Sequence, residues 1–346
     1  MTRGLVVRHF GPDPATVGGM ATVIRVLTEH GIGGDIVDFH ATWSPRSLLA
    51  TTRLFAASAR ALLRMPAGQV AHIHLSERGS FLREGALVAL ADRRGLVTVA
   101  TIHGASFVPF ASKHPRLVSA VLRRADLVTC LDQEVLDVVR RRAPDVHSEI
   151  VPNPVFVDDS FLPADQTDEL VVFAGEIGLR KGADVLLRAW QLVAQRRPEA
   201  SCLMAGPAGD FAPPDTERLV VRPPADPAEM KEILRRARVV ALPSRAEGMP
   251  MVLAEAMSLG RPFVSTPVGG IPELAGEGGG VLVPVDDEIG LADRLTDLLA
   301  DPELARTMGE RGRRFCLETR SVETIDARLR KLYSAAALDG SRRSAQ

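Results

Sequence analysis

Short apolar runs bounded by glycine, proline or charged residues alternate along the chain with longer segments whose apolar residues recur at helical spacing. This alternation is typical of parallel β-sheets covered by helices. In the first half, the runs predict strands at 5–9, 35–39, 70–75, 97–102, 127–130 and 149–151. In the second half, they predict strands at 170–174, 200–205, 220–221, 239–242, 262–265 and 280–283. We therefore expect an α/β protein with two sheets of similar strand number.

A segment rich in proline and acidic residues, 152–169, interrupts this pattern midway along the chain. Because such residues break regular structure, we predict an interdomain linker there. The length of 346 residues also suits two domains of ordinary size. The predicted divisions are an N-terminal Rossmann-like, acceptor-side domain at 1–158, a linker at 159–169, a C-terminal Rossmann-like, nucleotide-sugar-binding domain at 170–320, and a C-terminal helix at 321–338 that packs back toward the N-terminal domain.

Composition narrows the class of protein. The net charge of −1 gives no reason to expect a nucleic-acid partner. Three widely separated cysteines, Cys130, Cys202 and Cys316, fit neither a disulfide framework nor a zinc ribbon. The N-terminal apolar run is too short for a signal peptide, and no run reaches the roughly 18 apolar residues of a membrane span. We expect a cytoplasmic protein whose membrane contact is at most peripheral, at the inner face.

The densest chemical signal follows the predicted strand at 239–242, where a loop leads into a helix that opens near Pro250. Proline is suited to the first position of a helix. The free N–H groups of Met251 and Val252 at such a helix start can bind an anion such as pyrophosphate. Glu255 in the helix and Glu247 in the loop can both lie beside this anion-binding site. One carboxylate can then bind ribose hydroxyls and the other sugar hydroxyls. An ordinary strand–loop–helix connection with surface glutamates explains the same pattern.

A basic loop follows the predicted strand at 170–174 and includes Arg180 and Lys181. The apolar spacing of Leu186 and Trp190 predicts a helix directly after it. Positive charge near a helix N-terminus is unfavourable unless an anion offsets it, and a diphosphate would supply that anion. The alternative is a basic turn exposed to water.

Three motifs in the second half, taken in order, resemble the retaining glycosyltransferases of family 4. They are Glu176–Gly182, the pair Glu247 and Glu255 separated by seven residues with Gly248 beside the first, and Val268–Glu273. The similarity spans nearly the whole chain and is strongest over 170–284. It implies the GT-B fold, in which two Rossmann-like domains have a donor/acceptor cleft between them.

The resemblance also implies roles for individual residues. Lys181 contacts the donor diphosphate, Glu255 holds the ribose, and Glu247 with nearby loop amides holds the donor sugar. Many members carry an arginine where this chain has Glu176; Arg180 can supply that charge, and the role of Glu176 is open. The predicted catalytic residues are Lys181, Glu247 and His103, and the predicted donor-binding residues are Arg180, Gly248, Met249, Pro250, Met251, Val252, Glu255 and Arg222.

In the first half, Gly18 and Gly19 precede a predicted helix, where a phosphate or an acceptor oxygen can approach the backbone. A tight turn explains these glycines equally well. His103 follows the predicted strand at 97–102, the end of a strand at which open α/β sheets bind ligands. The resemblance places such a histidine near the transferred sugar, and a structural hydrogen bond to a loop carbonyl is the alternative.

The segment 74–84 resembles a stretch of family 4 enzymes that build exopolysaccharides on lipid carriers. Arg78 and Ser80 would then shape the acceptor side, although a helix start also accounts for them.

His72 and His74 alternate along a strand and share a face, which raises the possibility of a metal site with His103. We reject it because no carboxylate or cysteine ligand accompanies them. The chain also lacks an Asp-x-Asp motif.

The sequence therefore predicts a metal-independent glycosyltransferase, without a cofactor, that moves a sugar from a nucleoside diphosphate to an acceptor hydroxyl with retention of configuration. The acceptor is a glycan, a lipid-linked molecule or a small molecule. A sugar-nucleotide epimerase or hydrolase of the same architecture, and a non-catalytic nucleotide-sugar-binding partner, are the alternatives. The base is uracil, guanine or adenine, with Arg222 near the position that would read it. The sugar, the linkage and the oligomeric state are open.

Overall fold

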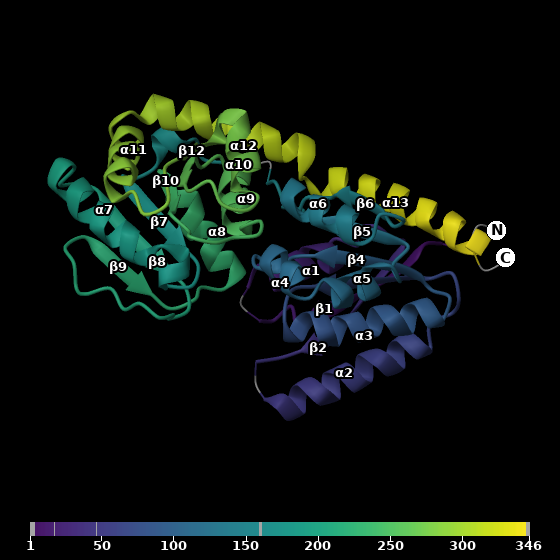
Figure 1. Ribbon diagram of the computed structural model, residues 1–346. Helices are drawn as coiled ribbons and strands as arrows, with labels where there is room; N and C mark the ends of the chain where they lie inside the picture. Colours follow the sequence, from purple (N-terminus) through teal and green to yellow (C-terminus); the bar gives the residue numbers. More distant parts are fainter. Residues whose placement is uncertain (1–3, 17, 46, 159–160, 344–346) are drawn as a thin grey trace. The chain divides into compact units, whose positions relative to one another are not determined.

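The computed structural model describes residues 4–16, 18–45, 47–158 and 161–343. The chain forms two compact units, the first made of Met1–Pro154 with Val322–Gln346 and the second of Val155–Ser321. Within the described residues, each unit contains one six-stranded parallel sheet covered by helices (Figure 1). The predicted α/β class with two Rossmann-like sheets is confirmed.

Each sheet changes winding direction between two neighbouring strands. The first sheet has the order β2-β1-β3-β4-β5-β6 and the second the order β12-β11-β10-β7-β8-β9. The winding reverses between β1 and β3 and between β7 and β10, and open α/β sheets bind ligands at the carboxyl ends of such strands. The strands of the first sheet are β1 (Val6–Pro12), β2 (Ile36–Trp43), β3 (Val70–Leu75), β4 (Val97–Ile102), β5 (Leu127–Cys130) and β6 (His147–Ile150). Those of the second are β7 (Leu170–Ala174), β8 (Ser201–Ala205), β9 (Leu219–Arg222), β10 (Val239–Leu242), β11 (Phe263–Ser265) and β12 (Gly280–Leu282).

Several helices begin where an acidic or hydroxyl side chain caps the first turn; Asp132, for example, accepts a hydrogen bond from the N–H of Val135 at 2.8 Å. The helices of the first unit are α1 (Gly19–Glu29), α2 (Leu48–Leu63), α3 (Gly79–Arg93), α4 (Phe107–Lys113), α5 (Pro115–Leu122), α6 (Gln133–Arg142) and α13 (Val322–Arg343). Those of the second are α7 (Ala183–Arg196), α8 (Pro227–Arg236), α9 (Met251–Ser258), α10 (Ile271–Leu274), α11 (Glu288–Ala300) and α12 (Pro302–Thr319), with short turns at Ala164–Gln166, Leu179–Lys181 and Ala275–Gly279.

In the part of the chain that the structure describes, no helix combines the length and the apolar composition needed to cross a membrane.

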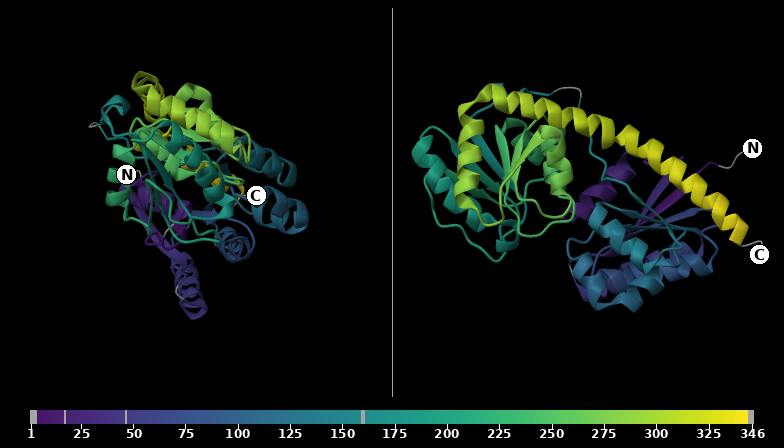
Figure 2. Two further views of the ribbon diagram at one scale, coloured as in Figure 1. Left: turned by 90° about the vertical axis from the view of Figure 1, so that its left-hand side faces the viewer. Right: turned by 45° about the horizontal axis from the view of Figure 1, so that its top comes forward.

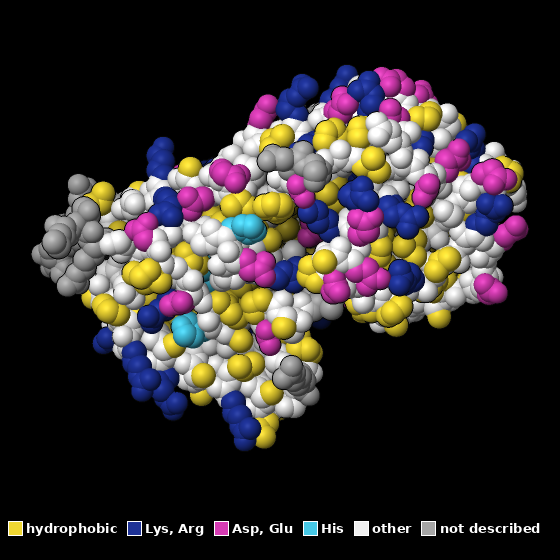
Figure 3. All heavy atoms as spheres, turned by 180° about the vertical axis from the view of Figure 1, so that it is seen from behind, with side chains coloured by type: hydrophobic (Ala, Val, Ile, Leu, Met, Phe, Trp, Pro, Cys, Tyr) yellow, Lys and Arg dark blue, Asp and Glu magenta, His cyan; other side chains and the backbone are white. Residues whose placement is uncertain are grey.

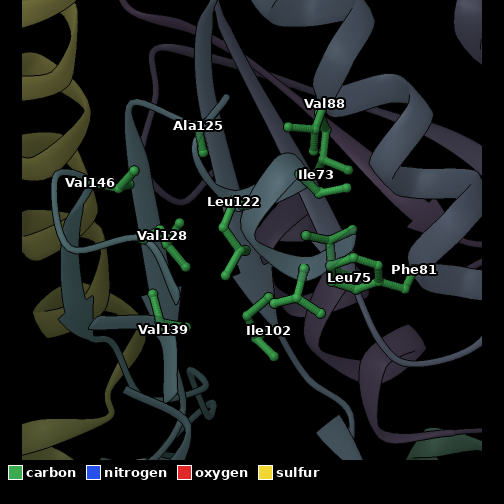
Figure 4. Close-up of a cluster of buried hydrophobic side chains, with 14 of the residues drawn as sticks. Ile73, Leu75, Phe81, Val88, Ile102, Leu122, Ala125, Val128, Val139 and Val146 are labelled. Atoms are coloured by element: carbon green, nitrogen blue, oxygen red, sulfur yellow. The ribbon is translucent and has the colours of Figure 1, made fainter. Parts of the chain in front are cut away.

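The two faces of the first sheet differ in chemistry. One face packs an apolar core against α3, α5 and α6, and Figure 4 shows Ile73 and Leu75 of β3 in this core with Phe81 of α3. The opposite face of β3 carries His72 and His74, which alternate with these apolar residues and are also buried. Helix α13 belongs to this unit and runs beside its strands (Figure 2, right). The polar face of the sheet is therefore inside the unit and not at its surface.

The segment predicted to be a linker is held by the second unit. The structure divides the chain after Pro154, and residues 161–169 lie within the second unit. Arg238 Nε donates to Thr167 Oγ1 at 3.1 Å, and Arg313 of α12 donates to the backbone oxygen of Asp158. These arginines are distant in sequence, so the local composition of the segment gives no sign of its attachment.

Candidate active site

Two loops at the winding reversal of the second sheet bring Lys181 and Glu247 together. One loop follows β7 and the other follows β10, which pairs directly with β7. Lys181 Nζ donates to Glu247 Oε1 at 2.5 Å, and Ser244 Oγ donates to the same oxygen at 2.7 Å. The side chains of Lys181 and Glu247 are 15% and 6% exposed. Two residues that the sequence predicted as catalytic thus form a largely buried ion pair.

This ion pair retains capacity for a ligand. An ammonium group carries three N–H donors, and one of them is used by Glu247. Both hydrogen bonds to the carboxylate end on Oε1, which leaves Oε2 to accept a further hydrogen bond. Removing either partner would leave the other charge poorly solvated. The pair can therefore bind an anion through Lys181 and a hydroxyl group through Glu247.

Arg245 fixes the relative position of the two loops. Its guanidinium donates two hydrogen bonds of 2.8 Å to the carboxylate of Asp184 and pairs with Asp286 at 2.6 Å. Its backbone N–H donates to the oxygen of Arg180 at 2.8 Å. The hydrogen bond from Arg245 holds the pKa of Asp184 below its usual range. Such bidentate contacts hold a site in one geometry before a ligand arrives.

Gly182 lets the loop after β7 approach the loop after β10. Its φ of 72° lies in the left-handed region, where a side chain is unfavourable. A Cβ atom at this position would lie 1.9 Å from the backbone oxygen of Pro243. Both the local conformation and the contact between the loops therefore require glycine.

The N–H groups predicted to bind an anion lie at the start of α9. This helix begins at Met251, and Pro250 precedes it as the capping residue. The N–H groups of a first helical turn have no partner within the helix, so Met251 and Val252 present donors at the end of β10. Glu255 is half-buried one turn later. The neighbouring Gly248 accepts a hydrogen bond from the N–H of Gly270 at 2.7 Å, and the side chain of Met249 is buried.

The two predicted arginines of the donor site lie in different places. Arg180 is exposed beside Lys181 and donates to the backbone oxygen of Ala246 at 3.3 Å. Arg222 ends β9, the outermost strand, and pairs with Glu229 at 3.0 Å. The structure therefore places Arg180, but not Arg222, at the winding reversal between β7 and β10.

In the first unit, the predicted glycine loop and the segment after β3 form separate helix starts. Helix α1 begins at Gly19 with Gly18 as its capping residue, and Val17 lies outside the described residues.

Arg78 precedes α3 with a φ of 56°, and it lines a pocket of about 600 Å³. Ser80 Oγ donates to Glu84 Oε2 at 2.8 Å, and burial raises the pKa of Glu84. Ser80 thus has a structural partner, whereas Arg78 faces a pocket.

His103 stands at one end of a layer of buried imidazole rings. His74 Nδ1 lies 2.9 Å from His103 Nε2, and His74 Nε2 lies 3.0 Å from His9 Nδ1. His72 Nδ1 lies 2.6 Å from the hydroxyl of Tyr333 in α13. Burial lowers the pKa of His9 and His103 to about 3, and it holds those of His72 and His74 well below the ordinary value.

The ring nitrogens of His9, His72 and His74 approach within 4.8 Å of one another, which is close enough to consider a metal ion. The rings of His72 and His74, however, are stacked, with centroids 4.4 Å apart and planes inclined by 17°. The lone pair of an imidazole lies in the ring plane, so stacked rings cannot direct two lone pairs at one ion. This geometry favours a hydrogen-bonded layer.

The sequence did not reveal several of these residues. Ser244 lies in the loop that carries Glu247, two residues after the end of β10, and this position near a predicted strand end was an available signal. His9 lies on β1, so its proximity to His74 depends on the pairing of β1 with β3. Tyr333 reaches the layer from the far end of the chain, which no local pattern indicates.

We expect the first unit to be more sensitive to acid than the second. All eight histidines lie in the first unit. His9 and His103 stay neutral in the folded chain down to about pH 3, whereas unfolded histidine binds a proton below its ordinary pKa of 6.5. As the pH falls through this window, the free energy of unfolding should fall by up to about 1.4 kcal/mol per pH unit for each such histidine.

The two tryptophans allow this expectation to be measured, because Trp43 lies in the first unit and Trp190 in the second. Urea unfolding would be followed by fluorescence in Trp190→Phe and in Trp43→Phe variants. Between pH 6.5 and pH 5, the midpoint reported by Trp43 should fall more than the midpoint reported by Trp190. Equal shifts would contradict the assignment of the acid sensitivity to the histidine layer.

Comparison with known proteins identifies relatives of this chain. Residues 168–301, which lie in the second unit, match the family described as Glycosyl transferases group 1. The predicted resemblance to glycosyltransferases with the GT-B fold is confirmed. The chain is 35% identical to the D-inositol 3-phosphate glycosyltransferase of Segniliparus rotundus over 164 residues, which are 44% of this chain and 36% of that protein. The aligned part of the chain thus spans about a third of the length of this relative.

Solved structures share the fold over nearly the whole chain. Sucrose-phosphate synthase from Thermosynechococcus elongatus superposes with a TM-score of 0.74 at 20% identity, covering 96% of this chain and 98% of that one. The Anabaena protein HepE in complex with UDP-glucose gives a TM-score of 0.75 at 15% identity, covering 96% and 100%. At these identities, the likeness establishes the architecture of the two units.

Proposed function

We propose that this chain is a glycosyltransferase that transfers a sugar from a nucleoside diphosphate to an acceptor hydroxyl with retention of configuration. The observation that carries the proposal is the arrangement of Lys181, Glu247 and the start of α9 at the winding reversal of the second sheet. It joins a cation, free N–H groups and a carboxylate at the place where such sheets bind ligands. The match of residues 168–301 to Glycosyl transferases group 1 supports glycosyl transfer.

In this proposal, the second unit binds the donor. Lys181 and the N–H groups of Met251 and Val252 contact the diphosphate, Glu255 accepts hydrogen bonds from the ribose, and Glu247 accepts one from the sugar. Arg180 adds positive charge near the diphosphate. These cations and N–H donors stabilise the negative charge that develops on the leaving group, so they lower the barrier as well as bind the donor.

The proposed reaction exchanges one bond at the anomeric carbon. The bond from this carbon to the diphosphate breaks, and a bond to the acceptor oxygen forms on the same face of the sugar. The acceptor proton passes to the departing diphosphate, whose charge is held by Lys181. Retention follows because attack and departure share a face, and no protein nucleophile is needed.

The first unit is proposed to bind the acceptor. Arg78 lines a pocket whose walls also include Leu82, Phe110 and Lys113, which suits an acceptor with both apolar and anionic parts. His103 is proposed to contact a hydroxyl group of the transferred sugar. Gly18 and Gly19 are proposed to leave the backbone open to a phosphate or an acceptor oxygen.

Helix α2 supports peripheral contact with a membrane. Leu48 and Leu49 at its start are 82% and 61% exposed. Three arginines follow in this segment, Arg53, Arg60 and Arg64, and no acidic residue accompanies them. Figure 3 shows Lys and Arg side chains projecting in dark blue along the edge of the first unit formed by α2. Exposed leucines and arginines together suit the interface of an anionic membrane.

A thermal-shift screen of nucleoside diphosphates tests the proposed donor site, because a ligand that binds only the folded chain raises its unfolding temperature. Uridine diphosphate comes first, since HepE is known in complex with UDP-glucose. Guanosine and adenosine diphosphates discriminate the base. The proposal expects stabilisation by at least one diphosphate that exceeds the stabilisation by the corresponding nucleoside. No stabilisation by any of the three would contradict the donor site.

Donor binding is expected to be independent of divalent metal. The proposed site offers Lys181 and the helix N–H groups to the diphosphate, and the chain has no Asp-x-Asp motif. A chelator should therefore leave both the affinity for nucleoside diphosphate and the rate of transfer unchanged. Loss of transfer on chelation, followed by recovery on addition of magnesium or manganese, would show this expectation to be wrong.

Glu255→Gln is expected to weaken the binding of nucleosides and nucleoside diphosphates by a similar factor, because the proposed partner of Glu255 is the ribose that both contain. Loss of one charge-assisted hydrogen bond corresponds to roughly a tenfold change in affinity. Calorimetric titration with both ligands gives the two factors. A loss confined to the diphosphate would assign Glu255 to the phosphates instead.

A further inference from the structure

Three imidazole rings in the first unit form one continuous chain of hydrogen bonds. His9 Nδ1 lies 3.0 Å from His74 Nε2, and His74 Nδ1 lies 2.9 Å from His103 Nε2. His9 and His74 are buried, whereas His103 is partly exposed after the carboxyl end of β4. His74 uses both of its ring nitrogens, so it connects a buried ring to one that a ligand can reach.

Because the rings are neutral imidazoles, the hydrogen bonds between them all point in one direction. A neutral ring has one N–H and one lone pair, so His74 donates one of its two hydrogen bonds and accepts the other. The protons of all three rings are therefore linked. Either both hydrogen bonds point toward His103, or both point toward His9. Burial keeps the rings neutral, since it lowers the pKa of His9 and His103 to about 3.

His9, at the buried end of the three hydrogen-bonded rings, decides between the two directions. His9 Nε2 is buried and has no hydrogen-bond partner among the described residues. If the hydrogen bonds pointed toward His9, this nitrogen would carry a proton with no acceptor. If they point toward His103, it keeps only an unused lone pair. In proteins, buried N–H groups without an acceptor are rarer than acceptors without a donor, so the second direction is favoured.

We propose that His9 and His74 are positioning residues that hold His103 in the tautomer with its proton on Nδ1, so that Nδ1 donates a hydrogen bond to a sugar hydroxyl. The partner of His103 rests on the proposed function, whereas the tautomer rests on the hydrogen bonds within the unit. His103 Nε2 is occupied as an acceptor from His74, which also fixes the plane of the ring. A ring in the opposite tautomer would offer a lone pair to the ligand instead of a proton.

His72 provides a matched comparison within the same layer. It lies on the same face of β3 as His74 and is equally buried. Its ring nitrogens, however, lie 2.6 Å from the Tyr333 hydroxyl and 2.5 Å from Thr101 Oγ1, and it makes no hydrogen bond to His103. We call the hydrogen-bonded series His9, His74 and His103 the relay. A change at His72 therefore disturbs the packing of the layer without removing a hydrogen bond of the relay.

The tautomer of His103 can be measured directly in the native chain. Two-bond ¹H–¹⁵N correlation spectra distinguish a protonated from an unprotonated imidazole nitrogen. A His103→Gln variant identifies which ring signals belong to His103. We expect Nδ1 to be protonated and Nε2 unprotonated near neutral pH. The reverse pattern, or a charged ring, would overturn the proposal without any measurement of activity.

Variants of His74 test the relay itself. In His74→Leu, the donor to His103 is lost, and the ring should exchange between both tautomers. In His74→Asn, an amide N–H can replace Nδ1–H and should restore the native pattern at least in part. His72→Asn should leave the His103 pattern unchanged. If His74→Leu kept the native tautomer, or if His72→Asn altered it as strongly as His74→Leu, the relay would be wrong.

The same variants connect the tautomer to transfer. His74→Leu should lower kcat/KM by about three- to tenfold, the effect of one neutral hydrogen bond, with recovery in His74→Asn. Failure of the native chain to transfer any sugar would contradict the proposed function and leave the spectra to decide the relay.

Titration with Zn²⁺ tests whether the same histidines bind a metal ion instead. Stoichiometric binding that shifts the ring signals of His9, His72 and His74 would replace the relay with a metal centre.

Discussion

Replacement of Lys181 by alanine is expected to weaken nucleoside diphosphate binding by roughly ten- to a hundredfold, which corresponds to a charge-assisted contact of about 1.5–3 kcal/mol. Turnover should fall by at least the same factor, because the lost interaction strengthens as the diphosphate departs. Binding of the nucleoside without phosphates should change little. Calorimetric titration of both ligands measures this difference.

Lys231→Ala is a suitable control. It removes another lysine of the second unit, one that pairs with Asp158 at 2.7 Å at the surface. It should leave nucleotide binding unchanged. Parent-like affinity of Lys181→Ala for nucleoside diphosphate would show the proposed donor site to be wrong at its centre. Equal weakening of nucleoside and nucleoside diphosphate would indicate damage to the loop.

A second substitution separates binding from stability. Lys181→Ala leaves the buried carboxylate of Glu247 without its cation, which should destabilise the second unit. Adding Glu247→Gln removes this charge and should recover much of the stability. The double variant should still bind nucleoside diphosphate weakly, because the cation is absent. Recovery of affinity together with stability would mean that Lys181 acts on the fold rather than on the ligand.

Gly182→Ala is expected to disrupt the site through the backbone. The new Cβ would lie 1.9 Å from the oxygen of Pro243, so the loops after β7 and β10 must separate. We expect a destabilisation of the second unit by about 3 kcal/mol or more, within the range of severe substitutions. Nucleotide affinity should fall as well, since the separation moves Lys181 away from Glu247. Urea unfolding monitored by Trp190 in a Trp43→Phe background measures the stability.

Gly95→Ala distinguishes the clash from the strain of the backbone. Gly95 has a similar φ of 64°, but no atom lies within 4 Å of the position of its Cβ. Because Gly95 lies in the first unit, its effect on stability is measured by Trp43 in a Trp190→Phe background. This substitution should cost only about 1 kcal/mol, the penalty for a left-handed conformation, and should leave nucleotide binding intact. Equal effects of the two substitutions would show that contact between the loops contributes nothing.

The buried strands were predictable because both faces of each lie inside the protein. Such strands are mostly apolar and end abruptly, and β4, β5 and β10 have the predicted bounds. β3 also has the predicted bounds, although it carries His72 and His74. β2 extends to Trp43, past the predicted end at residue 39, because a strand at the edge of the sheet tolerates polar residues such as His40. The hydrophobic pattern therefore locates interior strands better than edge strands.

The site was predictable only where its residues follow adjacent strands. Lys181 and Glu247 lie in the loops that follow β7 and β10, and the general rule for open α/β sheets indicates that these loops meet. Arg222 also lies at the carboxyl end of a strand, but the sequence does not show that β9 lies at the outer edge of the sheet. The histidine layer depends on the pairing of β1, β3 and β4 and on Tyr333 of α13. These contacts connect segments that are distant in the chain and follow no local rule.

Transfer of sugar by this chain can be followed through the fate of a labelled sugar. The chain would be incubated with UDP-glucose that carries ¹³C at the anomeric carbon, and then with other nucleotide sugars, together with a cell extract that supplies acceptors. NMR of the products shows where the labelled carbon goes. We expect a new glycosidic linkage with the anomeric configuration of the donor, and we expect this product to be lost in Lys181→Ala. Label recovered only as free sugar or as an isomerised nucleotide sugar, with no linkage to an acceptor, would contradict the proposed transfer.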